Sequence, residues 1–411
     1  MTSLATIDSI LKELNNPAKK VRILMIDAQQ DFCNDGVSAR PKGSLYVPNA
    51  NLDIEIMISM LEMLKKDKDR IEKFMATFDN HSEFHIAHEL LVDTDTKEPA
   101  KKFTIFKIDD TDNSIKGYAD GKPDGNTYIV NVAGFYKYKN LPLPKDIELE
   151  QKLLNAYART YIQLLGEHKK PAIKWPNHCI QGTSGQQLHE DLQRTITELG
   201  IRIFRFNKGM NNLTEKYSAV KPEVPVSDVI RELAKEFEGL GLESIVDTLA
   251  KYQDGAESDG ITDQNLITTA LDSPEPINIL LFGEASSHCV SGTGYDLIKE
   301  LDKYPNARLI YVSNAASPVT GSEVDGQKFL NVMNINDGKT FAVNFDSKSG
   351  IFTEAVVAAP AGGRRRNPFK SLLRKVTKRR KHMKHSTNKK RVKKQIRTRK
   401  GKKAQKTRSR K

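Results

Sequence analysis

Five short runs of apolar residues constrain the fold of this 411-residue chain more than any other feature of its sequence. Each run is continuously apolar rather than alternating, which is typical of strands that are buried on both faces of a parallel sheet. The runs are VRILMIDA (21–28), KFMATFDN (73–80), IRIFRFNKG (201–209), INILLFGEA (277–285) and ARLIYVSNA (307–315).

Helical patterns lie between these runs. Apolar residues recur at intervals of three and four in 52–66 and 185–200, and a third helix is predicted to begin near Cys289. The alternation of strands and helices predicts an α/β fold, a three-layer αβα sandwich with a mainly parallel sheet and right-handed crossovers.

Two stretches go beyond what such a sandwich requires. Residues 90–170 contain further strand patterns and a helical pattern, and residues 222–275 read largely as helix. We interpret both as insertions in one domain that spans residues 1–358, followed by a tail over residues 359–411.

Charge is distributed very unevenly along the chain. Residues 364–411 contain 25 Lys or Arg and no Asp or Glu, so the other 40 basic residues are outnumbered by 52 acidic ones and residues 1–363 carry a net charge of −12. The tail has no hydrophobic face, and we expect it to be disordered in isolation. Clustered Lys and Arg bind phosphate backbones without sequence preference. The tail is therefore predicted to bind nucleic acid or another polyanion, with nuclear targeting and no function as the alternatives.

The cysteines and the apolar segments bear on the compartment. Cys33, Cys179 and Cys289 are odd in number and lack CxxC spacing, which fits a reducing compartment. The N-terminus lacks the apolar region of a signal peptide. No apolar stretch approaches the roughly 18 to 20 residues needed to cross a membrane. We expect a soluble intracellular protein, cytoplasmic or nuclear, and the sequence does not distinguish a monomer from an oligomer.

Chemically active side chains follow four of the apolar runs. Asp27, Asp79 and Lys208 each end a run, and Cys289 follows the fourth run through GEASSH. Ligands of an open parallel sheet bind outside the carboxyl ends of its strands. A thiol becomes a nucleophile beside a helix N-terminus, a cation and a base. Cys289, Lys208 and Asp27 are therefore the parts of a cysteine amidohydrolase, with N–H groups of the turn that contains Ala285 able to bind an oxyanion.

The segment at the end of the second apolar run contains candidate metal ligands. Asp79 and His81 are two residues apart, and His85 follows four residues later. Each residue also has a simpler interpretation, because an Asp after a strand is commonly a turn former and a buried Cys is commonly a small apolar residue. The convergence of all of them on one sheet edge favours a functional site.

Five segments resemble, in order, the motifs of the nicotinamidases in the isochorismatase-like cysteine hydrolase superfamily. These segments are DAQQDFCNDG, DNHSEFH, WPNHCIQGTSGQQL, FNKGMNN followed by KYS, and GEASSHCVSGTGYDL. The resemblance covers the motif segments and the strands between them. Ser287 departs from it, because the family commonly has an acidic residue two positions before the nucleophile.

The resemblance implies a role for each motif residue. The catalytic residues would be Asp27, Lys208 and Cys289, the substrate-binding residues Phe32, Trp175 and Ala285, and the metal ligands Asp79, His81 and His178, with His85 as a further ligand or a partner of one. Zinc suits two imidazoles and a carboxylate, and iron and manganese accept similar sets. Trp175, the only tryptophan, would form a pocket wall against a flat ring. The alternative is a Trp-Pro loop that only plugs the sheet.

The implied reaction is the hydrolysis of nicotinamide to nicotinate and ammonia through a thioester, assisted by one divalent metal. Two alternatives stay open at this point. The first is a related hydrolase of another small amide or carbamoyl substrate, since the insertions can reshape the mouth of the pocket. The second is a nucleic-acid-associated protein whose hydrolase-like body is inert.

Removal of residues 364–411 tests the separation of body and tail, because it changes the net charge from +13 to −12. All five motif segments precede the tail, so we expect kcat and KM for nicotinamide to change little. Binding to duplex DNA should collapse, because an acidic body repels phosphates. For the full-length protein, log K should fall with log salt by about 0.9 per neutralised phosphate. Unchanged DNA affinity after truncation would place the contact surface elsewhere in the chain.

Overall fold

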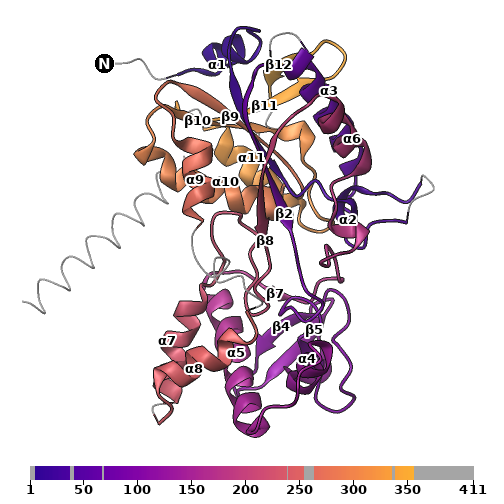
Figure 1. The fold of residues 1–411 in the computed structure, drawn as a ribbon, viewed down its shortest axis with the longest axis vertical. Helices are drawn as coiled ribbons and strands as arrows, with labels where there is room; N and C mark the ends of the chain where they lie inside the picture. The colour runs from indigo at the N-terminus through magenta and orange to yellow at the C-terminus, as the bar shows by residue number, and fades with distance from the viewer. Residues whose placement is uncertain are drawn as a thin grey trace, which may run out of the picture. The chain divides into compact units, whose positions relative to one another are not determined.

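The computed structural model describes residues 5–37, 41–66, 69–237, 239–253, 263–335 and 338–355. Its main sheet has seven strands in the order β12-β11-β10-β9-β1-β2-β8 (Figure 1). Neighbouring strands are parallel except for the antiparallel pair at one edge, β11 and β12. The strands are β1 (Val21–Ile26), β2 (Ile71–Asp79), β8 (Ile203–Lys208), β9 (Ile277–Gly283), β10 (Ala307–Val312), β11 (Thr340–Asp346) and β12 (Ile351–Glu354). The predicted α/β fold with a mainly parallel sheet is confirmed.

All five apolar runs form strands of this sheet, whereas β11 and β12 were not predicted. The run of β11 is interrupted by Asn344 and ends in an exposed Asp346. β12 is a short edge strand in which only Phe352 is buried. Edge strands face solvent and therefore lack the continuous apolar pattern of central strands.

Helices cover both faces of the main sheet. One core cluster contains buried residues of three helices, including Ile54 and Leu192, and a second cluster on the other side of the strands contains those of three more, including Leu266 and Val290. The first group is α1 (Ile7–Leu14), α3 (Ala50–Lys66) and α6 (Glu190–Glu198), and the second is α9 (Gln264–Leu271), α10 (Cys289–Glu300) and α11 (Glu323–Met333). These layers make the predicted αβα sandwich. The one-turn helix α2 (Gln30–Cys33) lies after β1.

Four strands within the predicted insertion at 90–170 and a fifth just after it form a second, antiparallel sheet (Figure 1). Its strands, in the order β3-β6-β5-β4-β7, are β3 (Leu91–Asp93), β4 (Ile105–Ile108), β5 (Ile115–Ala119), β6 (Lys122–Val130) and β7 (Ala172–Ile173). It shares a separate hydrophobic core with α4 (Val132–Tyr138), α5 (Ile147–Glu167), α7 (Val226–Glu236) and α8 (Leu242–Ala250). Within the stretch 222–275, α7 and α8 thus belong to the second core, while α9 packs against the main sheet.

The chain divides into one unit of residues 1–357 and another of residues 358–411. The second unit, and with it the predicted basic tail, lies outside the described residues. Among the described residues, no helix combines the length and the apolar character that crossing a membrane requires.

Arg22 links β1 to its neighbours from a buried position. Its guanidinium contacts Glu72 at 2.7 Å and donates to the carbonyl oxygens of Ala270 and Asp272 at 3.1 and 2.8 Å. We expect Arg22→Ala to lower the free energy of unfolding by about 3 to 5 kcal/mol, because the substitution strips buried acceptors of their donor. The exposed Arg231, which pairs with Asp228 on α7, is the matched control, and its removal should cost less than about 1 kcal/mol. Urea denaturation of both variants checks this, and equal effects would contradict it.

Candidate functional site

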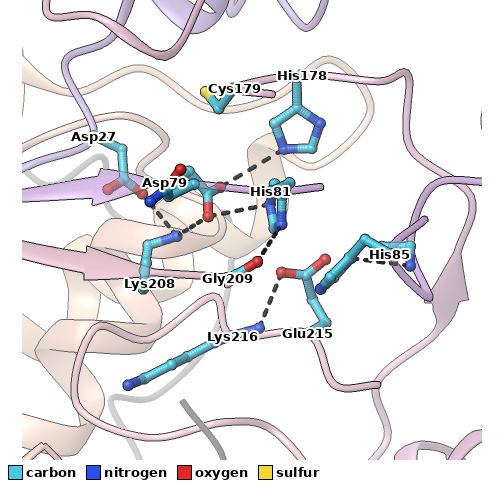
Figure 2. Close-up of polar contacts among 12 residues, drawn as sticks. Asp27, Asp79, His81, His85, His178, Cys179, Lys208, Gly209, Glu215 and Lys216 are labelled. Atoms are coloured by element: carbon cyan, nitrogen blue, oxygen red, sulfur yellow. Dashed lines mark hydrogen bonds and ion pairs between the residues drawn. The ribbon is translucent and has the colours of Figure 1, made fainter. Parts of the chain in front are cut away.

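Four chemically active side chains meet at the carboxyl edge of the main sheet, and Figure 2 labels three of them, Asp27, Asp79 and Lys208. Asp27 follows β1, Asp79 ends β2, Lys208 ends β8, and Cys289 begins α10 after β9. The strand register pairs Asp79 directly with Lys208, so these two residues end neighbouring strands at the same level. The parallel arrangement predicted from the apolar runs therefore brings all four side chains together.

The Lys208 ammonium lies at the centre of this group. Its Nζ is 2.9 Å from Asp27 Oδ2, 3.0 Å from Asp79 Oδ1 and 3.5 Å from Cys289 Sγ. All four side chains are buried. Figure 2 shows the ammonium lying between the two carboxylates.

The pKa values of the two carboxylates shift in opposite directions. Burial raises the pKa of the Cys289 thiol well above its ordinary value, although Lys208 opposes the effect. Burial also raises the pKa of Asp27, again against Lys208. For Asp79 burial acts in the same direction, but His81 and Lys208 hold its pKa well below the usual range. Asp27 is thus the more basic carboxylate and can accept the thiol proton, while Asp79 stays ionised.

Local structure orients Asp27 toward its partners. The residue adopts a positive φ of 44° immediately after β1. Its Oδ1 accepts a 2.6 Å hydrogen bond from the Thr77 hydroxyl, so Oδ2 is left to face Lys208. Thr77 lies on β2 and is fully buried. The neighbouring strand therefore fixes the rotamer of the candidate base.

A cluster of imidazoles adjoins Asp79. His81 Nε2 lies 3.1 Å from Asp79 Oδ1, and His178 Nε2 lies 3.6 Å from Asp79 Oδ2 (Figure 2). On its other side, His81 donates through Nδ1 to the carbonyl oxygen of Gly209 at 2.8 Å. His178 donates through Nδ1 to the carbonyl oxygen of Pro176, also at 2.8 Å. Both rings are therefore held by main-chain oxygens with Nε2 directed at the same carboxylate.

These contacts fit a divalent cation. With Nδ1 protonated, the Nε2 atoms of His81 and His178 carry lone pairs that face carboxylate oxygens of Asp79. Electron-rich atoms this close need a positive charge between them. A proton is one solution: burial alone would lower the pKa of His81, but Asp79 raises it to about 9. A metal bound by Asp79, His81 and His178 is the other, and two imidazoles with one carboxylate are a common zinc set.

His85 and His88 differ in what their ring nitrogens can do. His85 donates through Nε2 to the Thr214 carbonyl oxygen at 3.0 Å and accepts at Nδ1 from the Ala87 N–H at 3.2 Å, so both nitrogens are engaged. It packs against His81 with ring centroids 4.4 Å apart. His88 Nδ1 lies 3.3 Å from the Ser82 carbonyl oxygen, and its Nε2 lies 3.1 Å from His178 Nδ1, another ring of the cluster. His85 packs against the cluster, and His88 is the third histidine whose ligand atom lies close to those of His81 and His178.

Ligand atoms of His81, His88 and His178 all lie within 4.8 Å of one another, and so do those of Asp27, Asp79 and Cys289. The two groups are not equivalent. The second already surrounds the Lys208 ammonium, which occupies the place of a cation. The first adjoins the Asp79 carboxylate, which could balance a bound ion. The histidine group beside Asp79 is therefore the better metal site.

Glu215 is a further carboxylate that sequence reasoning missed. Its side chain lies next to His81 and His85 in Figure 2, and the residue is buried. Oε1 accepts from the Lys216 N–H at 3.0 Å, whereas buried Oε2 has no hydrogen-bond partner among the described residues. Burial raises the pKa of Glu215, although His81 opposes the shift. Glu215 lies within a segment that the motif resemblance had already singled out, between FNKGMNN and KYS.

A pocket opens onto the Cys289 thiol. Twelve residues line it: Phe32, Leu45, Val47, Asp79, Trp175, His178, Glu215, Tyr217, Ala285, His288, Cys289 and Val319. The three predicted substrate-binding residues, Phe32, Trp175 and Ala285, are all in its wall. A lining of aromatic and aliphatic side chains together with a thiol, two carboxylates and two imidazoles suits a small molecule that carries one reactive polar group.

Comparisons with known proteins give structural similarity only. No model of a known protein family matches the chain, and no curated protein matches it. Among solved structures, the yeast nicotinamidase is 17% identical over 78% of this chain and 98% of its own, with a TM-score of 0.40. An Acinetobacter baumanii nicotinamidase/pyrazinamidase is 15% identical over 81% and 99%, with a TM-score of 0.39. A zinc complex of Pyrococcus horikoshii pyrazinamidase is 16% identical over 79% and 99%, with a TM-score of 0.33.

Each of these TM-scores lies below 0.5. Neither the fold class nor the chemistry of the site depends on them. The fold class follows from the strand order and pairing of this chain. The chemistry follows from the contacts of its buried side chains.

Gly209 tests the metal site without removing a ligand. Its φ is +75°, and a Cβ here would overlap His81 Cε1 and lie 2.8 Å from Asp79 Oδ1. We expect Gly209→Ala to weaken zinc binding at least about tenfold, the range seen when the support of metal ligands is disturbed. Gly166→Ala on α5 is the control, because a Cβ there meets open space. Competition with a chromogenic chelator measures both, and wild-type affinity in Gly209→Ala would exclude this site.

Proposed function

We infer that this protein is a metal-assisted cysteine amidohydrolase that converts nicotinamide, or a closely related flat heteroaromatic amide, to the carboxylate and ammonia. One observation carries the proposal: the Lys208 ammonium contacts Asp27, Asp79 and Cys289 within a single buried group. A thiol, a base and a cation in mutual contact are what nucleophilic attack on an amide requires. The motif resemblance and the flat, aromatic cavity support the nicotinamide assignment.

The first half of the reaction follows from these contacts. Asp27 accepts the proton of Cys289, and the thiolate attacks the amide carbon to form a C–S bond. Main-chain N–H groups of the turn from Ala285 to Cys289 stabilise the oxyanion. The C–N bond then breaks as protonated Asp27 returns its proton to the leaving nitrogen. Ammonia departs and a thioester remains, while Lys208 keeps the local charge balanced.

The second half uses the same base. Asp27 takes a proton from water, and the resulting hydroxide attacks the thioester carbon. The C–S bond breaks, and the Cys289 thiolate recovers the proton from Asp27. The carboxylic acid ionises on release, and the site returns to its starting state.

Asp79, His81 and His178 would hold the metal, by the lone-pair argument given above. A bound divalent ion supplies a Lewis acid for a ring nitrogen and for water. The protein itself orients the ring: Phe32 and Trp175 lie in the cavity wall, and the Trp175 indole is fixed by donating to the Tyr217 hydroxyl at 2.9 Å.

Two other functions were open from the sequence, and ammonia release separates them from the proposal. Another small amide or carbamoyl compound as substrate would leave nicotinamide unhydrolysed while a different amide releases ammonia. An inert body would release none from any amide. The complete buried set of Asp27, Lys208 and Cys289 favours an enzyme, because burying an ammonium and two carboxylates is costly and serves no purpose in a scaffold that only binds.

Cys289→Ala should lower kcat for ammonia release from nicotinamide by about 10⁴-fold or more, because the nucleophile is lost. The fold should persist, since the change removes one sulfur atom at the start of a helix. Cys33→Ala is the matched control: Cys33 is also buried, but it lies outside the cavity wall. The activity of Cys33→Ala should stay near that of the wild type. Retained turnover in Cys289→Ala would rule out the thioester.

A further inference from the structure

A histidine that the proposed reaction does not use forms part of the cavity wall. His288 precedes the nucleophile, and its ring lies edge-on to both Trp175 and Tyr217, with centroids 5.4 Å from each. The hydrogen bond from the Trp175 indole to the Tyr217 hydroxyl ties these two neighbours together. The imidazole is thus confined in one orientation beside the place where a flat ring would lie.

Contacts of Ser287 assign the tautomer of this imidazole. The Ser287 Oγ accepts from the Val319 N–H at 3.0 Å and lies 2.9 Å from His288 Nδ1. Because Oγ already accepts from the Val319 N–H, we take the Ser287 O–H as the donor to Nδ1. A neutral imidazole carries one N–H, and this bond places it on Nε2.

The environment also keeps His288 uncharged. Burial, together with the charge of Lys170, lowers the pKa of His288 to about 4, so the ring is neutral at pH 7. An acidic side chain at position 287, which the family resemblance leads one to expect, would favour the imidazolium. The serine of this chain holds the ring through a hydrogen bond without that charge.

We propose that His288 is a specificity-determining residue, whose Nε2–H recognises a hydrogen-bond acceptor on the ring of a flat, uncharged heteroaromatic amide. The proposal rests on the proposed function, since it concerns the substrate of the same site. The aliphatic residues of the wall, Leu45, Val47 and Val319, offer a ring nitrogen no side-chain donor. A ring that turns a C–H toward His288 leaves Nε2–H unpaired, and one that turns a nitrogen toward it gains a hydrogen bond.

An aza scan of the substrate tests this recognition. Each ring C–H of nicotinamide is replaced in turn by nitrogen, and kcat/KM is measured relative to nicotinamide. For the wild type we expect one ring position at which nitrogen is favoured about tenfold, the size of one good hydrogen bond. In His288→Phe, which keeps a flat ring but has no donor, that preference should disappear. An aza preference that is the same in both proteins would overturn the proposal.

Ser287→Ala separates tautomer control from packing, because it leaves the imidazole in place. Losing the hydroxyl lets the proton move to Nδ1, so the aza preference should shrink mainly through a higher KM for the favoured compound. The matched control is Ser291→Ala, whose hydroxyl donates to the His288 carbonyl oxygen at 3.2 Å and not to the ring. The control should keep the wild-type preference. An equal loss of the aza preference in Ser287→Ala and Ser291→Ala would contradict the proposal that Ser287 sets the tautomer of His288.

Nitrogen-15 NMR of the full chain tests the tautomer without any turnover. The His288 signal is assigned by its absence in His288→Phe, and at pH 7 we expect a protonated Nε2 and an unprotonated Nδ1. The reverse tautomer, or a charged ring, would overturn the proposal. A wild-type protein that releases no ammonia from any heteroaromatic amide would instead refute the proposed function, whatever the NMR result.

Discussion

The structure of the site depends on one buried ammonium shared by two carboxylates. Lys208 can be buried only because Asp27 and Asp79 lie 2.9 and 3.0 Å away, and neither carboxylate could be buried so fully without it. Removing one partner from such a group costs several kcal/mol. The three strands that carry these residues, β1, β2 and β8, are consecutive in the sheet, so their register is tied to this charge balance.

Much of the fold and of the candidate site could be predicted because most of the strands concerned, the edge strand β8 excepted, are buried on two faces. Such strands have a continuous apolar pattern, and the residues at their carboxyl ends converge by geometry alone. This is why Asp27, Asp79, Lys208 and Cys289 could be grouped before the structure was seen. The edge strand β12 lacks that pattern, and in its neighbour β11 the apolar run is interrupted by Asn344, so neither was predicted.

The parts of the site that escaped prediction are set by loops. His88 and Glu215 lie in irregular segments, where no periodicity indicates which way a side chain points. For His85 the sequence left two roles open, and only the main-chain bonds at both of its nitrogens distinguish them. The proposed role of His288 could not be predicted either, because the tautomer of its ring depends on a contact between Ser287 and Val319, which are 32 residues apart in the chain. A lone sequence carries little information about such contacts.

The cavity wall combines residues of the main-sheet core with Trp175, which follows a strand of the second sheet, and this has a consequence for how such a protein can diverge. Phe32 belongs to the core of the main sheet, whereas Trp175 comes two residues after β7, the last strand of the second sheet. The residues of the proposed reaction, Asp27, Lys208 and Cys289, lie instead at the carboxyl edge of the main sheet. If the chain carries out that reaction, a change in the segment around Trp175 would alter the shape of the cavity without replacing any of these three side chains. Substrate range and chemistry would then depend on different segments of the chain.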